Sequence, residues 1–357
     1  MQEKIKDISL NDLKEIADIK KYITKTFEDG ETILHIAAGY NTNPEVITYL
    51  VEQGFDINER DNDNWQAIHY AACYNSNPVV INVLVQSGAV INSKADDGIQ
   101  PIHNAAKNKN IEILDAIINS GADINSKDDE NWSILHYAVL HNDNVKIIDK
   151  LIKLGLNINI NADGDLQPIH NAARNPNLEM IKKVFELGGD INSRDEDDWQ
   201  AIHFAAENEN PDILKFIINN GGDVNSRDNK NWQPIHQAAS YNSNLNIFKL
   251  LMDSGADINS VTNDEAKPIH YVSGYNSNPD ILEFLVNNGS RINAKDREGL
   301  QPIHLAVMFN KNPKMLEAII NCGGNVDAET YDGETPLSYA DYYRASNEIV
   351  EILNNSK

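Results

Sequence analysis

The stretch Gln100-Pro101-Ile102-His103-Asn104-Ala105-Ala106 is one copy of a phrase that recurs along the chain. Nine of the ten histidines stand at its fourth position, at intervals of 33 or 34 residues: His35, His69, His103, His136, His170, His203, His236, His270 and His304. A tenth copy, Thr335-Pro336-Leu337-Ser338, carries serine at that position. Self-similarity at a fixed period of this length predicts a solenoid of stacked repeats.

Each repeat contains signals for two short helices. Pro101 follows a polar residue and suits the first position of a helix, and pairs such as Asn77-Pro78 supply the N-cap and first residue of a second helix. The second helix carries an apolar stripe, as in 111–118, and Gly121 ends it. One such pair cannot bury its stripe alone, so neighbouring copies must stack.

Phrases such as Gly121-Ala-Asp-Ile-Asn125 follow about twenty residues after the histidines, and two small residues follow most histidines directly. This pattern resembles the ankyrin repeat, and the resemblance covers residues 30 to about 357. It implies an all-α repeat solenoid, an array of helix-turn-helix units joined by β-hairpin-like loops. It also implies that the hairpin tips and first helices line a concave face that binds other proteins.

The expected organisation is an N-terminal helical cap at 1–29, nine repeats at 30–330 and a C-terminal capping repeat at 331–357. In the first segment Ser9 and Asp12 have the spacing of a helix start. They precede an amphipathic stretch with the apolar residues Leu13, Ile16, Ile19, Tyr22 and Ile23.

Two features depart from the family pattern. Gln replaces the usual Thr before the first helix in six repeats, and Gln is a poor N-cap. Either its longer amide reaches another partner or those helix starts are less well fixed. The usual Gly two residues earlier is replaced in six repeats by Asn64, Asn131, Asp165, Asp198, Asn231 and Glu265. We expect a left-handed backbone there, which Asn and Asp tolerate better than Glu, so Glu265 with Ala266 marks the weakest repeat.

Charge and composition restrict the partners and the compartment. The net charge of −24 and pI of about 4.7 oppose binding to nucleic acid or to an anionic membrane. No apolar run approaches the roughly 18 residues of a membrane span, and no apolar signal core begins the chain. Cys73 and Cys322 form no pair motif, which fits a reducing compartment. We therefore expect a cytoplasmic protein.

The sequence offers no starting point for catalysis or for a cofactor. The usual phosphate-binding, zinc-protease, dinucleotide and serine-hydrolase motifs are absent. The periodic histidines lie one per repeat, too far apart to share a metal ion, so we interpret them as structural groups. Acidic hairpin segments such as 195–198 lack the spacing of a calcium loop. We predict no enzymatic activity, no metal and no cofactor.

Three columns of aligned residues are the candidate partner-binding positions. The hairpin column, just before the Gln or Thr, holds all four tryptophans within a run of apolar residues: Trp65, Ile99, Trp132, Leu166, Trp199, Trp232, Ala266 and Leu300. The post-histidine column alternates aromatic and amide residues and includes Tyr70, Tyr137, Phe204 and Tyr271. The turn column, at the helix-helix turn, holds Tyr40, Tyr74, His141, Tyr241, Tyr275 and Phe309.

Trp and Tyr are preferred interface anchors, so these columns predict a binding stripe. The indoles could instead staple neighbouring hairpins together, and the two-repeat alternation of the aromatic residues could reflect duplication alone. The pairing of a tryptophan with an aromatic residue after the histidine of the same repeat is broken at Trp232, because Gln237 follows His236.

We therefore expect a scaffold that binds a partner protein with basic and apolar surface through an aromatic-lined concave face; the alternative is an architectural spacer without a specific ligand. We expect no nucleic acid and no membrane, and the sequence does not indicate an oligomeric state. The abundance of Asn, Ile and Lys is typical of AT-rich genomes, including those of intracellular bacteria and protists that direct ankyrin-repeat proteins at host proteins. Delivery into a host cytosol as an effector is thus a second expectation for localisation.

Overall fold

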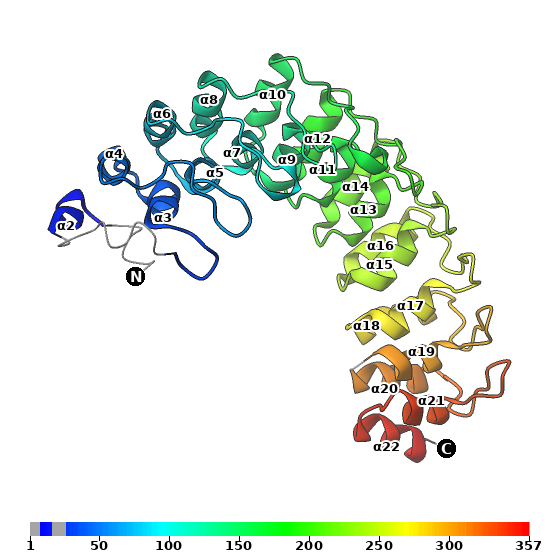
Figure 1. Cartoon of the computed structure of the whole chain (residues 1–357). Helices are drawn as coiled ribbons and strands as arrows, with labels where there is room; N and C mark the ends of the chain where they lie inside the picture. Colours follow the sequence, from blue (N-terminus) through cyan, green and yellow to red (C-terminus); the bar gives the residue numbers. More distant parts are fainter. Residues whose placement is uncertain (1–7, 16–25, 311, 357) are drawn as a thin grey trace. The chain divides into compact units, whose positions relative to one another are not determined.

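The computed structural model describes residues 8–15, 26–310 and 312–356 as paired helices joined by long loops (Figure 1). The chain divides into two compact units, Met1–Pro168 and Ile169–Lys357. The described residues contain no β-strand, only an isolated antiparallel bridge between Lys127 and Ser133. The all-α repeat solenoid is therefore confirmed.

In the first unit, each repeat has one helix after its Gln, Thr or Ser position and one after its Asn turn. The first helices are α3 (Ile33–Tyr40), α5 (Ala67–Tyr74), α7 (Pro101–Lys107) and α9 (Ile134–His141). The second helices are α4 (Pro44–Glu52), α6 (Pro78–Gln86), α8 (Ile111–Asn119) and α10 (Lys146–Lys153). Short 3-10 turns lie at η2 (Asp96–Gly98) and η3 (Asp163–Asp165). Successive first helices pack against one another, and so do α4, α6 and α8.

The second unit repeats this arrangement. Its first helices are α13 (Ala201–Glu207), α15 (Pro234–Tyr241), α17 (Pro268–Tyr275), α19 (Pro302–Phe309) and α21 (Pro336–Tyr342), and α11 (Pro168–Arg174) starts at the unit boundary. Its second helices are α12 (Leu178–Glu186), α14 (Pro211–Asn219), α16 (Leu245–Asp253), α18 (Pro279–Asn287), α20 (Pro313–Asn321) and α22 (Asn347–Asn355). The apolar stripes of the second helices are buried against neighbouring repeats, as at Ile213, Leu214 and Ile217.

The histidines fix the start of the first helices. In the Gln66 repeat the backbone N–H of Gln66 donates to Nδ1 of His69 (3.0 Å). Nε2 therefore carries the proton of the neutral ring and donates to the Ser93 carbonyl (3.2 Å). Equivalent Nε2 contacts with the following hairpin recur at His103, His170, His236, His270 and His304.

Glutamine at the helix start reaches a different partner, which accounts for the first departure from the family pattern. Nε2 of Gln66 donates to the carbonyl of Asn58, eight residues earlier (3.0 Å). Gln200 and Gln233 make the same bond to Asn192 and Asn225, and Lys267 makes it through Nζ to Asn259. A long side chain with an N–H donor thus ties these four helix starts to the loops before them.

The left-handed residues before the helices lie where the sequence predicts them. Asn64, Asn131, Asp165, Asp198, Asn231 and Glu265 have φ between 54° and 65°. Glu265 adopts this strained conformation at φ 61°, and its hairpin still closes through a bond from Thr262 N to the Ala266 carbonyl (3.0 Å). Neighbouring hairpins are also joined along their tips, as by Asn229 N to the Asp197 carbonyl (3.0 Å).

Buried asparagines form a ladder that the repeat pattern did not predict. The residue that follows every first helix except α21 is Asn. The amide of Asn276 donates to the carbonyls of Ala239 and Asn242 in the preceding repeat (3.2 and 2.8 Å). Its Oδ1 accepts from Asn278 N (3.0 Å), and Asn278 in turn caps α18. The same donation to the preceding repeat is made by Asn75, Asn108, Asn142, Asn208, Asn242 and Asn310.

The described ends of the chain pack against the outermost repeats. Ser9 and Asp12 form reciprocal hydrogen bonds at the start of α2 (Leu10–Glu15), which buries Leu13. Ile16, Ile19, Tyr22 and Ile23 of the predicted cap lie outside the described residues. At the other end Oγ of Ser338 accepts from Thr335 N (2.9 Å), replacing a histidine, and α22 buries Ile349 and Leu353. The boundaries at residues 29 and 330 stay predictions.

Candidate protein-binding face

Aspartates at the base of the hairpins position the four tryptophans. Oδ1 of Asp195 accepts from the backbone N–H of Trp199, four residues on (2.8 Å), and Asp61, Asp128 and Asp228 hold Trp65, Trp132 and Trp232 in the same way. Each indole tilts against the histidine of its own repeat, with ring centroids 5.6 to 6.0 Å apart.

The hairpin column is less exposed than a free stripe would be. All four tryptophans, Ile99 and Leu166 are half-buried, whereas Ala266 and Leu300 are buried. The indole of Trp199 also donates through Nε1 to Oδ2 of Asp228 in the next repeat (3.1 Å). The column therefore contributes to contacts between repeats as well as to the surface.

The post-histidine column lies beneath the tryptophans. The hydroxyls of Tyr70 and Tyr137 donate to Oδ2 of the hairpin aspartates Asp61 and Asp128 (2.6 and 2.5 Å). Burial, the bond to Asp61 and its charge raise the pKa of Tyr70, so that hydroxyl stays protonated. Tyr137 and Phe204 are buried, whereas Tyr70 and Tyr271 are half-buried. Tyr70, Tyr137 and Phe204 pack against the tryptophans of their own repeats.

The turn column is the exposed part of the predicted site. Tyr40, Tyr74, Tyr241, Tyr275 and Phe309 have exposed fractions of 36% to 69%, and His141 is also exposed. They end the first helices, where side chains point out at the helix-helix turn. In the first unit Tyr40 stacks on Tyr74 (5.3 Å, 15°); in the second, Tyr275 stacks on Phe309 (5.3 Å, 17°). Adjacent repeats thus present pairs of parallel rings to solvent.

A protein-family model that describes three consecutive ankyrin repeats matches the chain four times, at residues 7–95, 77–162, 169–262 and 269–357. The chain belongs to the ankyrin-repeat family. Ankyrin repeats generally mediate protein–protein interactions and are typically not enzymes. No curated protein matches the chain.

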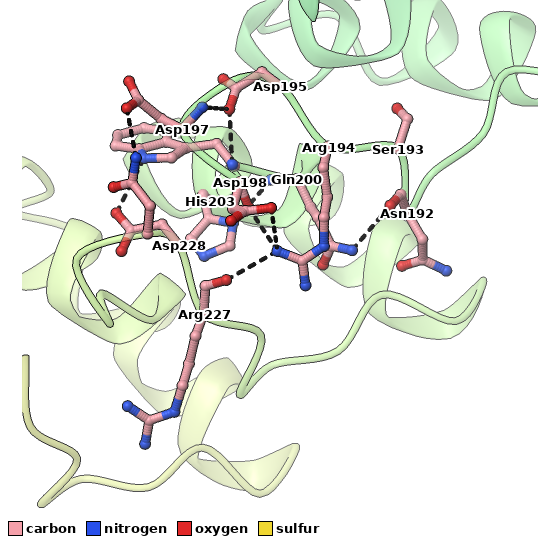
Figure 2. Close-up of polar contacts among 12 residues, drawn as sticks. Asn192, Ser193, Arg194, Asp195, Asp197, Asp198, Gln200, His203, Arg227 and Asp228 are labelled. Atoms are coloured by element: carbon pink, nitrogen blue, oxygen red, sulfur yellow. Dashed lines mark hydrogen bonds and ion pairs between the residues drawn. The ribbon is translucent and has the colours of Figure 1, made fainter.

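Carboxylates at the base of the ankyrin hairpins are turn caps. Figure 2 shows Asp195, Asp197 and Asp198 on one hairpin and Asp228 on the next. Oδ1 of Asp195 accepts from Asp197 N (3.0 Å) as well as from Trp199 N. Arg194 links the two hairpins by donating to the carbonyls of Asp198 and Arg227 (2.9 and 3.0 Å). Burial raises the pKa of Asp195 and Asp228, because water is excluded from the base of these turns.

The structural histidines of the ankyrin repeats are neutral. Burial lowers the pKa of His69, His203, His236 and His270 to about 4. In the part of the chain that the structure describes, no group of three or more His, Cys, Asp or Glu could hold a metal ion.

The same described ranges contain no helix that is long and apolar enough to cross a bilayer. Exposed carboxylates lie at the hairpin tips, as at Asp63, Asp129, Glu130 and Glu298.

Proposed function

We propose that this ankyrin-repeat array is a non-enzymatic scaffold that binds a partner protein through its aromatic columns. The observation that carries the proposal is the exposed turn column. Stacked pairs such as Tyr275 with Phe309 offer large, rigid apolar surfaces, with exposed fractions of 53% and 42%. Aromatic side chains of this kind are the usual anchors of protein interfaces, because they bury much area at a low cost in conformational entropy.

The charge of the chain defines the partner's surface. Acidic residues exceed basic ones by 24, and the hairpin tips beside the aromatic columns carry exposed carboxylates. A partner with exposed basic and apolar groups is complementary to this surface, and a phosphate backbone is not. We place the interaction in a reducing cytosol, either of the producing cell or of a host. The two free cysteines, Cys73 and Cys322, support that assignment.

The proposal can be tested by affinity capture from a cell lysate. The proteins retained on two immobilised variants are compared with those retained on the unaltered chain. One variant carries Tyr74→Ser, Tyr241→Ser, Tyr275→Ser and Phe309→Ser. The matched control carries Val79→Ser, Val90→Ser and Leu154→Ser, which remove exposed apolar side chains outside the aromatic columns. We expect the first variant to lose specific proteins that the unaltered chain and the control both retain.

Circular dichroism must show that both variants keep the helix content of the unaltered chain. If all three proteins then retain the same set of proteins, or none of them retains a specific protein, the aromatic columns do not form a binding face. The architectural spacer would then be the better description of the array.

A further inference from the structure

Gln237 interrupts the aromatic pattern of the tryptophan repeats. Where an aromatic residue follows the histidine, its ring lies against the tryptophan of the same repeat: Tyr70 on Trp65 (5.5 Å), Tyr137 on Trp132 (5.6 Å) and Phe204 on Trp199 (5.0 Å). Gln237 brings no ring to Trp232. The indole of Trp232 packs on Tyr271 of the following repeat instead (4.4 Å).

A pocket of about 190 Å³ lies at this interruption, within the second unit. Three aromatic side chains, Trp199, Trp232 and Tyr241, line it together with Gln237, Asp197 and Asp228. Tyr241 is more exposed than the other tyrosines and the phenylalanine of the turn column, so the pocket opens onto the proposed binding face.

One of the residues that line the pocket, Gln237, has a side-chain acceptor without a donor. Gln237 is only 2% exposed, and its Oε1 accepts no hydrogen bond. A buried carbonyl without a donor is costly, so this atom favours a ligand that brings an N–H group. The oxygens of Asp228 already accept from Trp199 Nε1 and from the backbone N–H groups of Lys230 and Trp232.

Asp197 supplies charge at the rim, on the hairpin tip seen in Figure 2. Its Oδ1 accepts from Nδ2 of Asn229 (2.8 Å), and its side chain is exposed. Lys230 also lines the pocket, but its side chain is exposed, and two carboxylates outweigh one ammonium group. The pocket thus combines aromatic walls, a buried acceptor and negative charge.

We propose that this pocket binds an arginine side chain of the partner protein. The inference rests on the proposed function and names one contact within it. A planar guanidinium group stacks on indole faces through cation–π attraction, and its five N–H donors match the acceptors that line the pocket, Gln237 Oε1 and the carboxylate of Asp197. Lysine has a compact, strongly hydrated ammonium group that fits flat aromatic walls less well.

The test is an NMR titration of the full chain, labelled with ¹⁵N-tryptophan, with N-acetyl-arginine amide as the probe. The readout is the position of the indole N–H signals. Only four signals are present, because the chain has four tryptophans, and Trp→Phe variants assign them. We expect the Trp199 and Trp232 signals to shift saturably during a titration to about 50 mM. The signals of Trp65 and Trp132 serve as internal references and should stay in place.

A neutral ligand analogue and two protein variants test whether binding depends on the positive charge of the probe and on this pocket. N-acetyl-citrulline amide has nearly the same shape without the charge, and we expect it to bind about tenfold more weakly than the arginine probe. Gln237→Tyr restores the residue found at this position in the Trp65 and Trp132 repeats, fills the pocket and should abolish the shifts. Asp197→Asn should weaken binding severalfold with the fold unchanged.

The assignment is overturned if the two indole signals do not move, if citrulline binds as well as arginine, or if Gln237→Tyr responds like the unaltered chain. These results would leave the proposed function standing, because retention of a partner by the turn column is measured separately.

Discussion

Nε1 of Trp199 donates a 3.1 Å hydrogen bond to Oδ2 of Asp228, which lies on the hairpin of the next repeat. Trp132 has no equivalent bond among the described residues, because the next hairpin carries Ala162 in place of an aspartate. Two tryptophans in the same column therefore differ in one respect. Trp199 is joined to its neighbouring repeat by a polar contact, and Trp132 is not.

Replacing each of these tryptophans by Phe should separate stapling from surface exposure. Trp199→Phe leaves Oδ2 of the buried Asp228 without a donor, so we expect the free energy of unfolding to fall by about 1–3 kcal/mol more than in Trp132→Phe. Both changes remove the same ring area, which makes Trp132→Phe the matched control. Urea unfolding followed by circular dichroism measures the difference. Equal losses in the two variants would show that the bond to Asp228 contributes nothing to the stability of the array.

The sequence predicts the repeat, the two helices and the left-handed turns, because each depends on residues close together in the chain. His69 and Asn64 illustrate this: a period and a backbone preference are enough to place them. The exposure of a tryptophan depends instead on how one hairpin lies against the next, which no local pattern specifies. This is why the hairpin column is half-buried although its alignment suggests an open stripe.

The buried asparagines show a different limit of prediction from the sequence. From composition alone, we interpret the high content of Asn, together with that of Ile and Lys, only as a feature of an AT-rich genome. In the structure Asn276 satisfies two carbonyls of the preceding repeat and one N–H of its own turn. The sequence signal for this ladder is the recurrence of asparagine directly after the first helices. Similarly, the break at Gln237 is visible in the sequence, but the pocket beside it depends on packing between repeats.

Removing one rung of the asparagine ladder should destabilise the second unit strongly. Asn276→Ala leaves three backbone groups around a buried side chain without their partner, so we expect a loss of about 2–4 kcal/mol in the free energy of unfolding. Asn288→Ala is the control, because this residue is exposed and its amide donates to the Phe284 carbonyl of its own repeat. Thermal and urea unfolding measure both. Similar small losses in the two variants would contradict a structural role for the ladder.

Stability should fall as the pH is lowered from 6.5 towards 4. His69, His203, His236 and His270 have a native pKa of about 4, and a histidine in the unfolded chain has a pKa of about 6.5. The unfolded state binds more protons in this window, so their stabilising contribution is complete above about pH 6.5 and is lost as the pH falls. At pH 5 we expect a loss of roughly 2 kcal/mol for each of these histidines.

Urea titrations at pH 7, 6 and 5 measure this dependence. His141→Gln is the comparison: His141 is exposed, and although partial burial also lowers its pKa, this one residue should account for only a small part of the pH dependence. A stability that is constant between pH 7 and 5 would contradict neutral, buried histidines in the native repeats.

The acidic surface should accelerate association with a basic partner and contribute less to holding the complex together. With 24 more acidic than basic residues, the chain attracts a positively charged protein over distances that salt screens, about 8–10 Å at physiological ionic strength. The association rate should therefore fall as salt rises from about 50 to 500 mM, whereas the dissociation rate, set by buried aromatic contacts, should change less. Stopped-flow kinetics with the purified partner measure both rates. A labelled DNA duplex in the same buffers is the negative control, because two polyanions repel each other. An association rate that does not change with salt would mean that the carboxylates serve solubility alone and that binding depends on the aromatic columns.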